Sequence, residues 1–123
     1  MDPVSHSVLV VEDDPDIRVA LVEIIEEHGF SVVGVGDGAA ALDFLARAEE
    51  LPCVILLDLM MPVMDGASFR EAQRNDPRLS AIPVVVLSAY RDVERHASGL
   101  DAATVLRKPP SVRELISVLQ AHC

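Results

Sequence analysis

Acidic, hydroxyl and amino side chains recur where the apolar runs of this sequence end. Asp58 directly follows the run Cys53–Leu57, which is apolar enough for a fully buried strand. A carboxylate is costly to bury unless it is paired or bound to a metal, so its place at the end of such a strand indicates a site. Three further runs end in the same manner, at the acids Glu12, Asp13 and Asp14, at Ser88 and at Lys108.

These residue types together suit phosphoryl transfer. Crowded carboxylates repel one another and recruit a cation, and oxygen ligands without Cys or His favour Mg²⁺ or Ca²⁺ over zinc. Lys108 adds an ammonium group and Ser88 a hydroxyl donor. With such partners, Asp58 could attack phosphorus as a nucleophile. Alone, Asp58 could cap a turn and Lys108 could be a surface residue, but their joint placement at strand ends favours a site.

The elements that would position these residues alternate along the chain. Apolar runs predict strands at 7–11, 30–35, 53–57, 83–88 and 104–107. Helical spacing and capping residues predict helices at 15–29, 38–50, 67–75, 92–99 and 111–122. The alternation predicts an α/β fold with a parallel sheet covered on both faces. Ligands of such sheets bind beyond the carboxyl ends of the strands, so the residues above should converge on one edge.

Length and composition restrict the classes of function. The 123 residues predict one domain, 1–123, and 50% apolar residues indicate a globular core. A net charge of −10 and an aromatic content of 3% argue against direct binding to nucleic acids or anionic membranes. Cys53 and Cys123 match no disulfide framework or metal spacing, which fits a cytoplasmic location. The ends at Met1 and Cys123 fit a stand-alone domain, with excision from a hybrid kinase as the alternative.

Four motifs in combination resemble the receiver domain of bacterial two-component response regulators. They are "VLVVEDDPDIR" (8–18), "VILLDLMMPVMDG" (54–66), "VVVLSA" (84–89) and "RKP" (107–109). The resemblance covers residues 6–122 and implies a flavodoxin-like, doubly wound sheet of strand order 2-1-3-4-5 with five helices.

The resemblance also implies a phospho-acceptor switch. Asp58 would receive a phosphoryl group from a histidine kinase or a phosphotransfer protein, and Ser88 and Lys108 would contact that group. A downstream protein would recognise the change at the fourth helix, the fifth strand and the last helix. A second copy of the chain, in a homodimer, is a further possible partner. The domain would assist its own phosphorylation and dephosphorylation without turning over an external substrate.

A magnesium site is the further implication of the resemblance. Mg²⁺ would be held by Asp13, Asp58 and the backbone carbonyl of Met60, with Glu12 as an outer acid that acts through water. Asp14 lies outside this acid pair and is expected to cap the following helix.

Other functions share parts of the pattern. An aspartyl-nucleophile phosphatase also places Asp at a strand end with Mg²⁺, but Met60 stands where its second acid would be. A pseudo-receiver that binds partners without phosphorylation would not need the intact set of acids, Ser88 and Lys108. "GVGDGA" (34–39) fits the glycine fingerprint of a dinucleotide site, yet it follows the second predicted strand and not the first. A flavodoxin-like electron carrier needs a phosphate loop and stacking aromatics that the sequence lacks.

One position departs from the receiver pattern. Receivers usually carry Tyr or Phe three residues before the lysine, where this chain has Val105. Valine is stiff at χ1 and has no ring, so either the loop after Ser88 carries the switch alone or Tyr90 supplies a moving aromatic ring. The resemblance further implies a cis peptide bond between Lys108 and Pro109.

Overall fold

Five parallel strands form one sheet in the order β2-β1-β3-β4-β5, the order that the resemblance to receiver domains implies. The strands are β1 (Ser7–Val11), β2 (Ser31–Val35), β3 (Val54–Asp58), β4 (Val84–Ser88) and β5 (Thr104–Arg107). The computed structural model describes residues 7–58, 66–88, 104–107 and 110–123. In these ranges the helices are α1 (Pro15–Glu27), α2 (Gly38–Arg47), α3 (Gly66–Arg74) and α5 (Val112–His122). The helix expected at 92–99 lies outside the described residues.

Apolar content decides which strands lie inside the sheet. All residues of β3 are buried, as their near-continuous run of Val, Ile and Leu predicts for a central parallel strand. In contrast, β2 is an edge strand and is partly exposed along its length. Asp58 is the last residue of β3, where the sequence predicted it just after the strand. The strand therefore positions the backbone of Asp58 directly.

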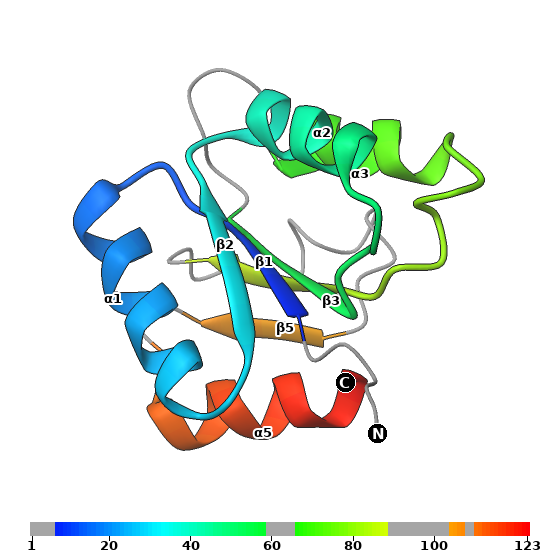
Figure 1. Cartoon of the computed structure of the whole chain (residues 1–123). Helices are drawn as coiled ribbons and strands as arrows, with labels where there is room; N and C mark the ends of the chain where they lie inside the picture. The colour runs from blue at the N-terminus through cyan, green and yellow to red at the C-terminus, as the bar shows by residue number, and fades with distance from the viewer. Residues whose placement is uncertain (1–6, 59–65, 89–103, 108–109) are drawn as a thin grey trace.

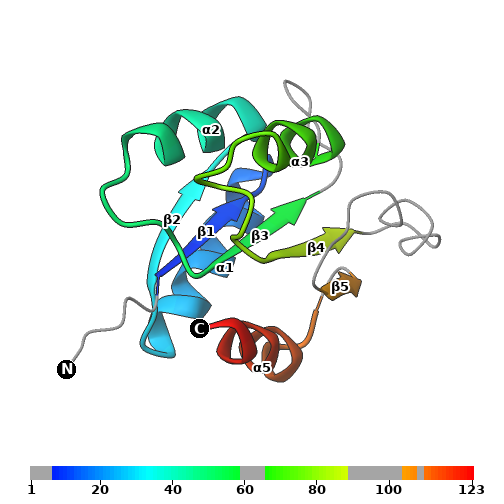
Figure 2. The same cartoon turned by 90° about the vertical axis from the view of Figure 1, so that its right-hand side faces the viewer.

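Helices cover both faces of the sheet, with α1 and α5 on one face and α2 and α3 on the other (Figures 1 and 2). Alternate strand residues supply the two cores because successive side chains of a strand point to opposite faces. Val8, Val10 and Leu56 pack with residues of α1 and α5. Leu9 and Leu57 pack with residues of α2 and α3. The two-sided core predicted from the sequence is confirmed.

Helix ends follow the capping residues that the sequence offers. Asp14 is the N-cap of α1, as expected, and its carboxylate accepts hydrogen bonds from the backbone amides of Asp16 and Ile17. The chain leaves α1 through Gly29, whose φ of 94° is a left-handed conformation that glycine adopts without strain. Ser111 and Glu114 form the predicted capping box of α5.

A buried amide organises the connection from α3 to β4. The side chain of Gln73 is fully buried, and its Nε2 donates to the backbone carbonyls of Leu79 at 2.9 Å and Ile82 at 3.0 Å. Its Oε1 accepts from Nη1 of Arg70 at 2.7 Å. These bonds satisfy backbone groups just before β4, and so they help to set where β4 begins.

A disulfide joins Cys53, just before β3, to Cys123 after α5, with a Cα–Cα distance of 5.4 Å. The residues are 70 positions apart in the chain. Their spacing does not predict this bond, and the expectation that they belong to no disulfide framework is wrong. The bond ties the end of α5 to the start of β3, at the end of the sheet opposite the carboxyl ends of the strands. Within the part of the chain that the structure describes, no helix combines the length and the apolar character needed to cross a bilayer.

Candidate functional site

The carboxyl ends of β1 and β3 bring three carboxylates together. Val11 is the register partner of Leu57, so Glu12, which directly follows β1, lies next to Asp58, the last residue of β3. Carboxylate oxygens of Glu12, Asp13 and Asp58 all lie within 4.8 Å of one another. The convergence predicted from the strand ends is therefore present for these acids, which we call the acid cluster.

Two members of the acid cluster are buried. Glu12 is 1% exposed and Asp58 is 6% exposed, whereas Asp13 is open to solvent. The backbone amide of Asp14 donates to Oε2 of Glu12 at 3.2 Å. Carboxylates crowded together at low exposure repel one another strongly, and a divalent cation would offset this repulsion.

The donor atoms of the acid cluster fit magnesium. They are all carboxylate oxygens, the hard ligands that Mg²⁺ prefers, and the cluster contains no Cys or His of the kind that selects zinc. Mg²⁺ usually keeps several of its water ligands. The exposure of Asp13 leaves one side of the cluster accessible to such waters.

The other predicted site residues are placed less completely. Ser88 is the last residue of β4, and the preceding Leu87 is the register partner of Asp58, so Ser88 lies at the same edge of the sheet. Val105 lies in β5 and pairs with Val86 of β4. Four residues with predicted roles lie outside the described ranges, namely Met60, Tyr90, Lys108 and Pro109.

One residue beside the acid cluster was not singled out from the sequence. Arg18, on the first turns of α1, donates from Nη1 to the backbone carbonyl of Glu12 at 2.8 Å. A backbone carbonyl gives no signal in the sequence, so only the fold reveals this contact. Gly34 in β2 and Gly36 just after it indicate in the sequence only that some group could approach closely there, and not that this group is Arg18.

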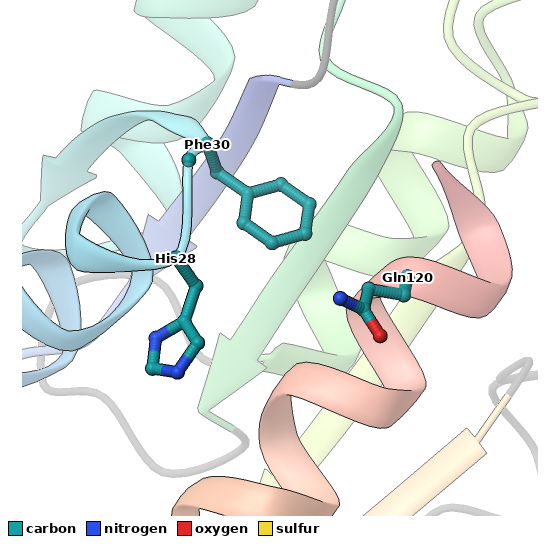
Figure 3. A pocket seen from close by; sticks show the side chains of 4 residues that line it. His28, Phe30 and Gln120 are labelled. Carbon is teal, nitrogen blue, oxygen red and sulfur yellow. The ribbon is translucent and has the colours of Figure 1, made fainter.

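A pocket lies at the opposite end of the strands from the acid cluster. The pocket, of about 200 Å³, is lined by His28, Gly29, Phe30 and Gln120, between the α1–β2 connection and α5 (Figure 3). Nδ1 of His28 lies 2.8 Å from the carbonyl oxygen of Ile24 in its own helix. Its lining contains no carboxylate or lysine, so this pocket lacks the groups that phosphoryl transfer needs.

The family model for the response regulator receiver domain matches residues 8–120. The chain belongs to this family. It is similar to the DNA-binding response regulator MtrA of Mycolicibacterium smegmatis, with 34% identity over 99% of this chain and 52% of MtrA. It is also similar to the transcriptional regulatory protein PrrA of Mycobacterium tuberculosis, with 39% identity over 95% of this chain and 49% of PrrA. This receiver domain thus spans about half the length of these curated relatives.

Solved structures agree with this assignment. A sensor protein from Polaromonas sp. JS666 is 34% identical and superposes with a TM-score of 0.87, over 98% of this chain and 96% of that one. The receiver domain of the sensor histidine kinase PA1611 from Pseudomonas aeruginosa is 26% identical, with a TM-score of 0.87 and coverage of 97% and 98%. That structure has a magnesium ion coordinated in its active site cleft.

Family membership decides the broad class of function. Receiver domains of two-component systems are signalling switches and generally not enzymes. The phosphoprotein and magnesium chemistry expected from the sequence is typical of such domains. The resemblance drawn from the four motifs is therefore confirmed. A dinucleotide site at "GVGDGA" is not needed to explain Gly34 and Gly36, because side chains of α1 approach both of them closely.

Proposed function

We propose that this receiver domain is a phospho-acceptor switch in which Asp58 carries the phosphoryl group. The observation that supports this most directly is the acid cluster, in which a nearly buried Asp58 stands at the end of the central strand beside Glu12 and Asp13. An oxygen of Asp58 would form the new bond to phosphorus while the bond from phosphorus to the donor's imidazole nitrogen breaks.

The acid cluster would hold Mg²⁺ for this transfer. Asp13 and Asp58 would bind the metal directly, Glu12 through water, and the carbonyl of Met60 from the loop after β3. The bound metal would neutralise charge on the phosphoryl oxygens. The burial of Glu12 and Asp58 supports the proposal, since it keeps bulk water from screening these charges.

Ser88 and Lys108 would convert phosphorylation into a change of shape. Ser88, at the end of β4, would donate a hydrogen bond from its hydroxyl to a phosphoryl oxygen, and the ammonium group of Lys108 would pair with the phosphoryl oxygens. The face that changes would include β5, α5 and the segment between β4 and β5. A downstream protein, or a second copy of the chain, would recognise that face.

The partners and location follow from this chemistry. A histidine kinase or a phosphotransfer protein would donate the phosphoryl group, and the domain would act in the cytoplasm. The net charge of −10 argues against direct contact of this domain with DNA. We further propose that residues 1–123 act as one receiver domain, which catalyses nothing beyond its own phosphorylation and dephosphorylation.

Labelling with a small phosphodonor tests the proposal. The protein is incubated with acetyl phosphate and Mg²⁺, and the hydroxylamine-sensitive adduct is mapped by mass spectrometry. We expect labelling at Asp58 that is lost in Asp58→Asn and in EDTA. Asp43→Asn, an exposed position on α2, is the matched control and should label normally. Full labelling of Asp58→Asn would overturn the assignment, and a wild-type chain that no phosphodonor or kinase labels would be a pseudo-receiver.

A further inference from the structure

Arg18 reaches from α1 to the backbone of the acid cluster. Its Nη1 donates to the carbonyl oxygen of Glu12 at 2.8 Å, and this carbonyl belongs to the peptide unit that joins Glu12 to Asp13. The amide of Glu12 donates to the carbonyl of Val35 in β2 at 3.0 Å. Both backbone groups of Glu12 are thus held, one by the sheet and one by the guanidinium group of Arg18.

Two glycines, Gly34 in the edge strand β2 and Gly36 just after it, make room for the Arg18 side chain. A Cβ atom at Gly34 would lie 3.1 Å from Cγ of Arg18, and one at Gly36 would lie 3.3 Å from its Nη1. Neither glycine has the positive φ that would itself require glycine. At Gly34, Cγ2 of Val22 would lie equally close, at 3.1 Å. The close approach of these α1 side chains, with Arg18 at both positions, therefore accounts for the two glycines better than backbone conformation does.

This explains the part of "GVGDGA" that fits a nucleotide fingerprint. Gly34 and Gly36 accommodate the stem and head of Arg18, and the next residue, Asp37, caps α2 by accepting a hydrogen bond from the amide of Ala40 at 2.8 Å. Contacts within the chain therefore account for Gly34, Gly36 and Asp37 without a bound nucleotide.

We propose that Arg18 is a positioning residue for the metal site. By holding the carbonyl of the Glu12–Asp13 peptide unit, it sets the direction in which the carboxylate of Asp13 leaves the backbone and keeps that carboxylate within the acid cluster. The inference rests on the proposed function, since it concerns how the same cluster binds Mg²⁺. Because the hydrogen bond from Arg18 is present before Mg²⁺ binds, less conformational freedom of the Asp13 side chain is lost on binding, and the affinity for Mg²⁺ is higher.

Charge and position make opposite predictions for this residue. A guanidinium group near a cation site repels the cation. If only this charge mattered, removing the guanidinium group would tighten Mg²⁺ binding. Removing the hydrogen bond to the Glu12 carbonyl would instead loosen Asp13 and weaken binding. The sign of the change in affinity therefore separates a positioning role from a purely electrostatic effect.

An NMR titration of the full chain tests the inference. Mg²⁺ is added to the wild type, Arg18→Ala, Arg18→Lys and Gly36→Ala, and the dissociation constant is read from backbone amide shifts. We expect Arg18→Ala to weaken Mg²⁺ binding by about threefold to tenfold, the factor that loss of one hydrogen bond implies. Arg18→Lys keeps the charge with a shorter donor and should fall between the wild type and Arg18→Ala.

A second readout needs no metal. Loss of the hydrogen bond to the Glu12 carbonyl should shift the amide resonance of Asp13 in the metal-free protein, because that amide shares the peptide unit. Gly36→Ala should produce a smaller change of the same kind, and no further change when added to Arg18→Ala. Arg47→Ala removes the same charge from an exposed side chain of α2 and should alter neither readout.

The two readouts keep this inference separate from the proposed function. A wild-type protein that binds no Mg²⁺ would overturn the proposed function, while the metal-free shift of Asp13 would still decide whether Arg18 holds the peptide unit. If the wild type binds Mg²⁺ and Arg18→Ala binds it equally or more tightly, the positioning role is wrong and the proposed function stands. An unchanged Asp13 resonance in Arg18→Ala would also overturn it.

Discussion

Ser88 ends β4 one residue beyond Leu87, the register partner of Asp58 on β3. The hydroxyl residue and the carboxylate residue thus end neighbouring parallel strands at the same edge of the sheet. A phosphoryl group on Asp58 would extend beyond the end of β3. Ser88 lies one residue further along β4, in the same direction. This register is the reason to expect a signal to leave the site along β4.

Ser88→Ala should separate phosphoryl binding from signalling. With beryllofluoride and Mg²⁺, the wild type should show changed amide exchange at residues 88–100 and in α5, because the Ser88 hydroxyl would move toward the bound group. Ser88→Ala should still bind beryllofluoride but lose these changes, as measured by hydrogen–deuterium exchange. Ser80→Ala, an exposed serine before β4, should behave as the wild type. Equal exchange changes in Ser88→Ala and the wild type would show that this hydroxyl does not carry the signal.

Asp13 and Asp14 are adjacent acids for which we predict opposite results. Asp13→Asn removes a charge from the acid cluster and should weaken Mg²⁺ binding by at least about tenfold, since charged ligands dominate such sites. Asp14→Asn should leave Mg²⁺ binding nearly unchanged, because asparagine caps a helix about as well as aspartate. The amide-shift titration measures both. Similar losses in the two variants would mean that bulk charge, and not the geometry of the cluster, governs affinity.

Gln73→Leu should destabilise the fold without touching the acid cluster. The side chain is fully buried and donates to the carbonyls of Leu79 and Ile82. Leaving a buried polar partner unsatisfied costs about 1–3 kcal/mol, so the free energy of unfolding in urea should fall by roughly that amount. Gln120→Leu, an exposed position on α5, should change it by less than about 0.5 kcal/mol. A neutral Gln73→Leu would show that the connection before β4 does not depend on this amide.

Reduction should weaken the fold through Cys53 and Cys123. The disulfide closes a long loop between them, so opening it with a phosphine reductant should lower the free energy of unfolding by about 2–4 kcal/mol. Sγ of Cys53 lies 3.0 Å from the carbonyl oxygen of Ser7, so the reduced thiol would have an acceptor at hand. Cys123→Ser should match the reduced wild type in stability and should not respond to the reductant.

Thiol titration checks that the bond forms. Protein purified without reductant should show no reactive thiol when denatured, and reduction should expose the thiols of Cys53 and Cys123. Cytoplasmic disulfides are usually transient or redox-sensing, so in the proposed location this bond would respond to the cell's redox state. Free thiols in the unreduced, denatured protein would contradict the pairing.

For the part of the chain that the structure describes, the sequence by itself determined the strands, the helices and the end of the sheet at which the acids meet. Apolar runs and capping residues are local signals, and they placed β3 to within a residue and named Asp14 and Ser111 as helix caps. Parallel strands share a direction, so acids that follow two such runs must meet at one edge. That geometric rule is why Glu12, Asp13 and Asp58 could be named as a group before their distances were known.

Contacts between distant segments were decided only by the tertiary structure. Cys53 and Cys123 became neighbours because α5 packs back across the sheet, and no spacing within the chain encodes that approach. The bond from Arg18 ends on a backbone carbonyl, a group present in every residue and therefore invisible in a sequence. Gly34 and Gly36 resembled part of a nucleotide motif until the fold placed the Arg18 side chain against them. A glycine indicates only that another group approaches closely. The packing of α1 on β2 determined that this group is Arg18 at both glycines, together with Val22 at Gly34.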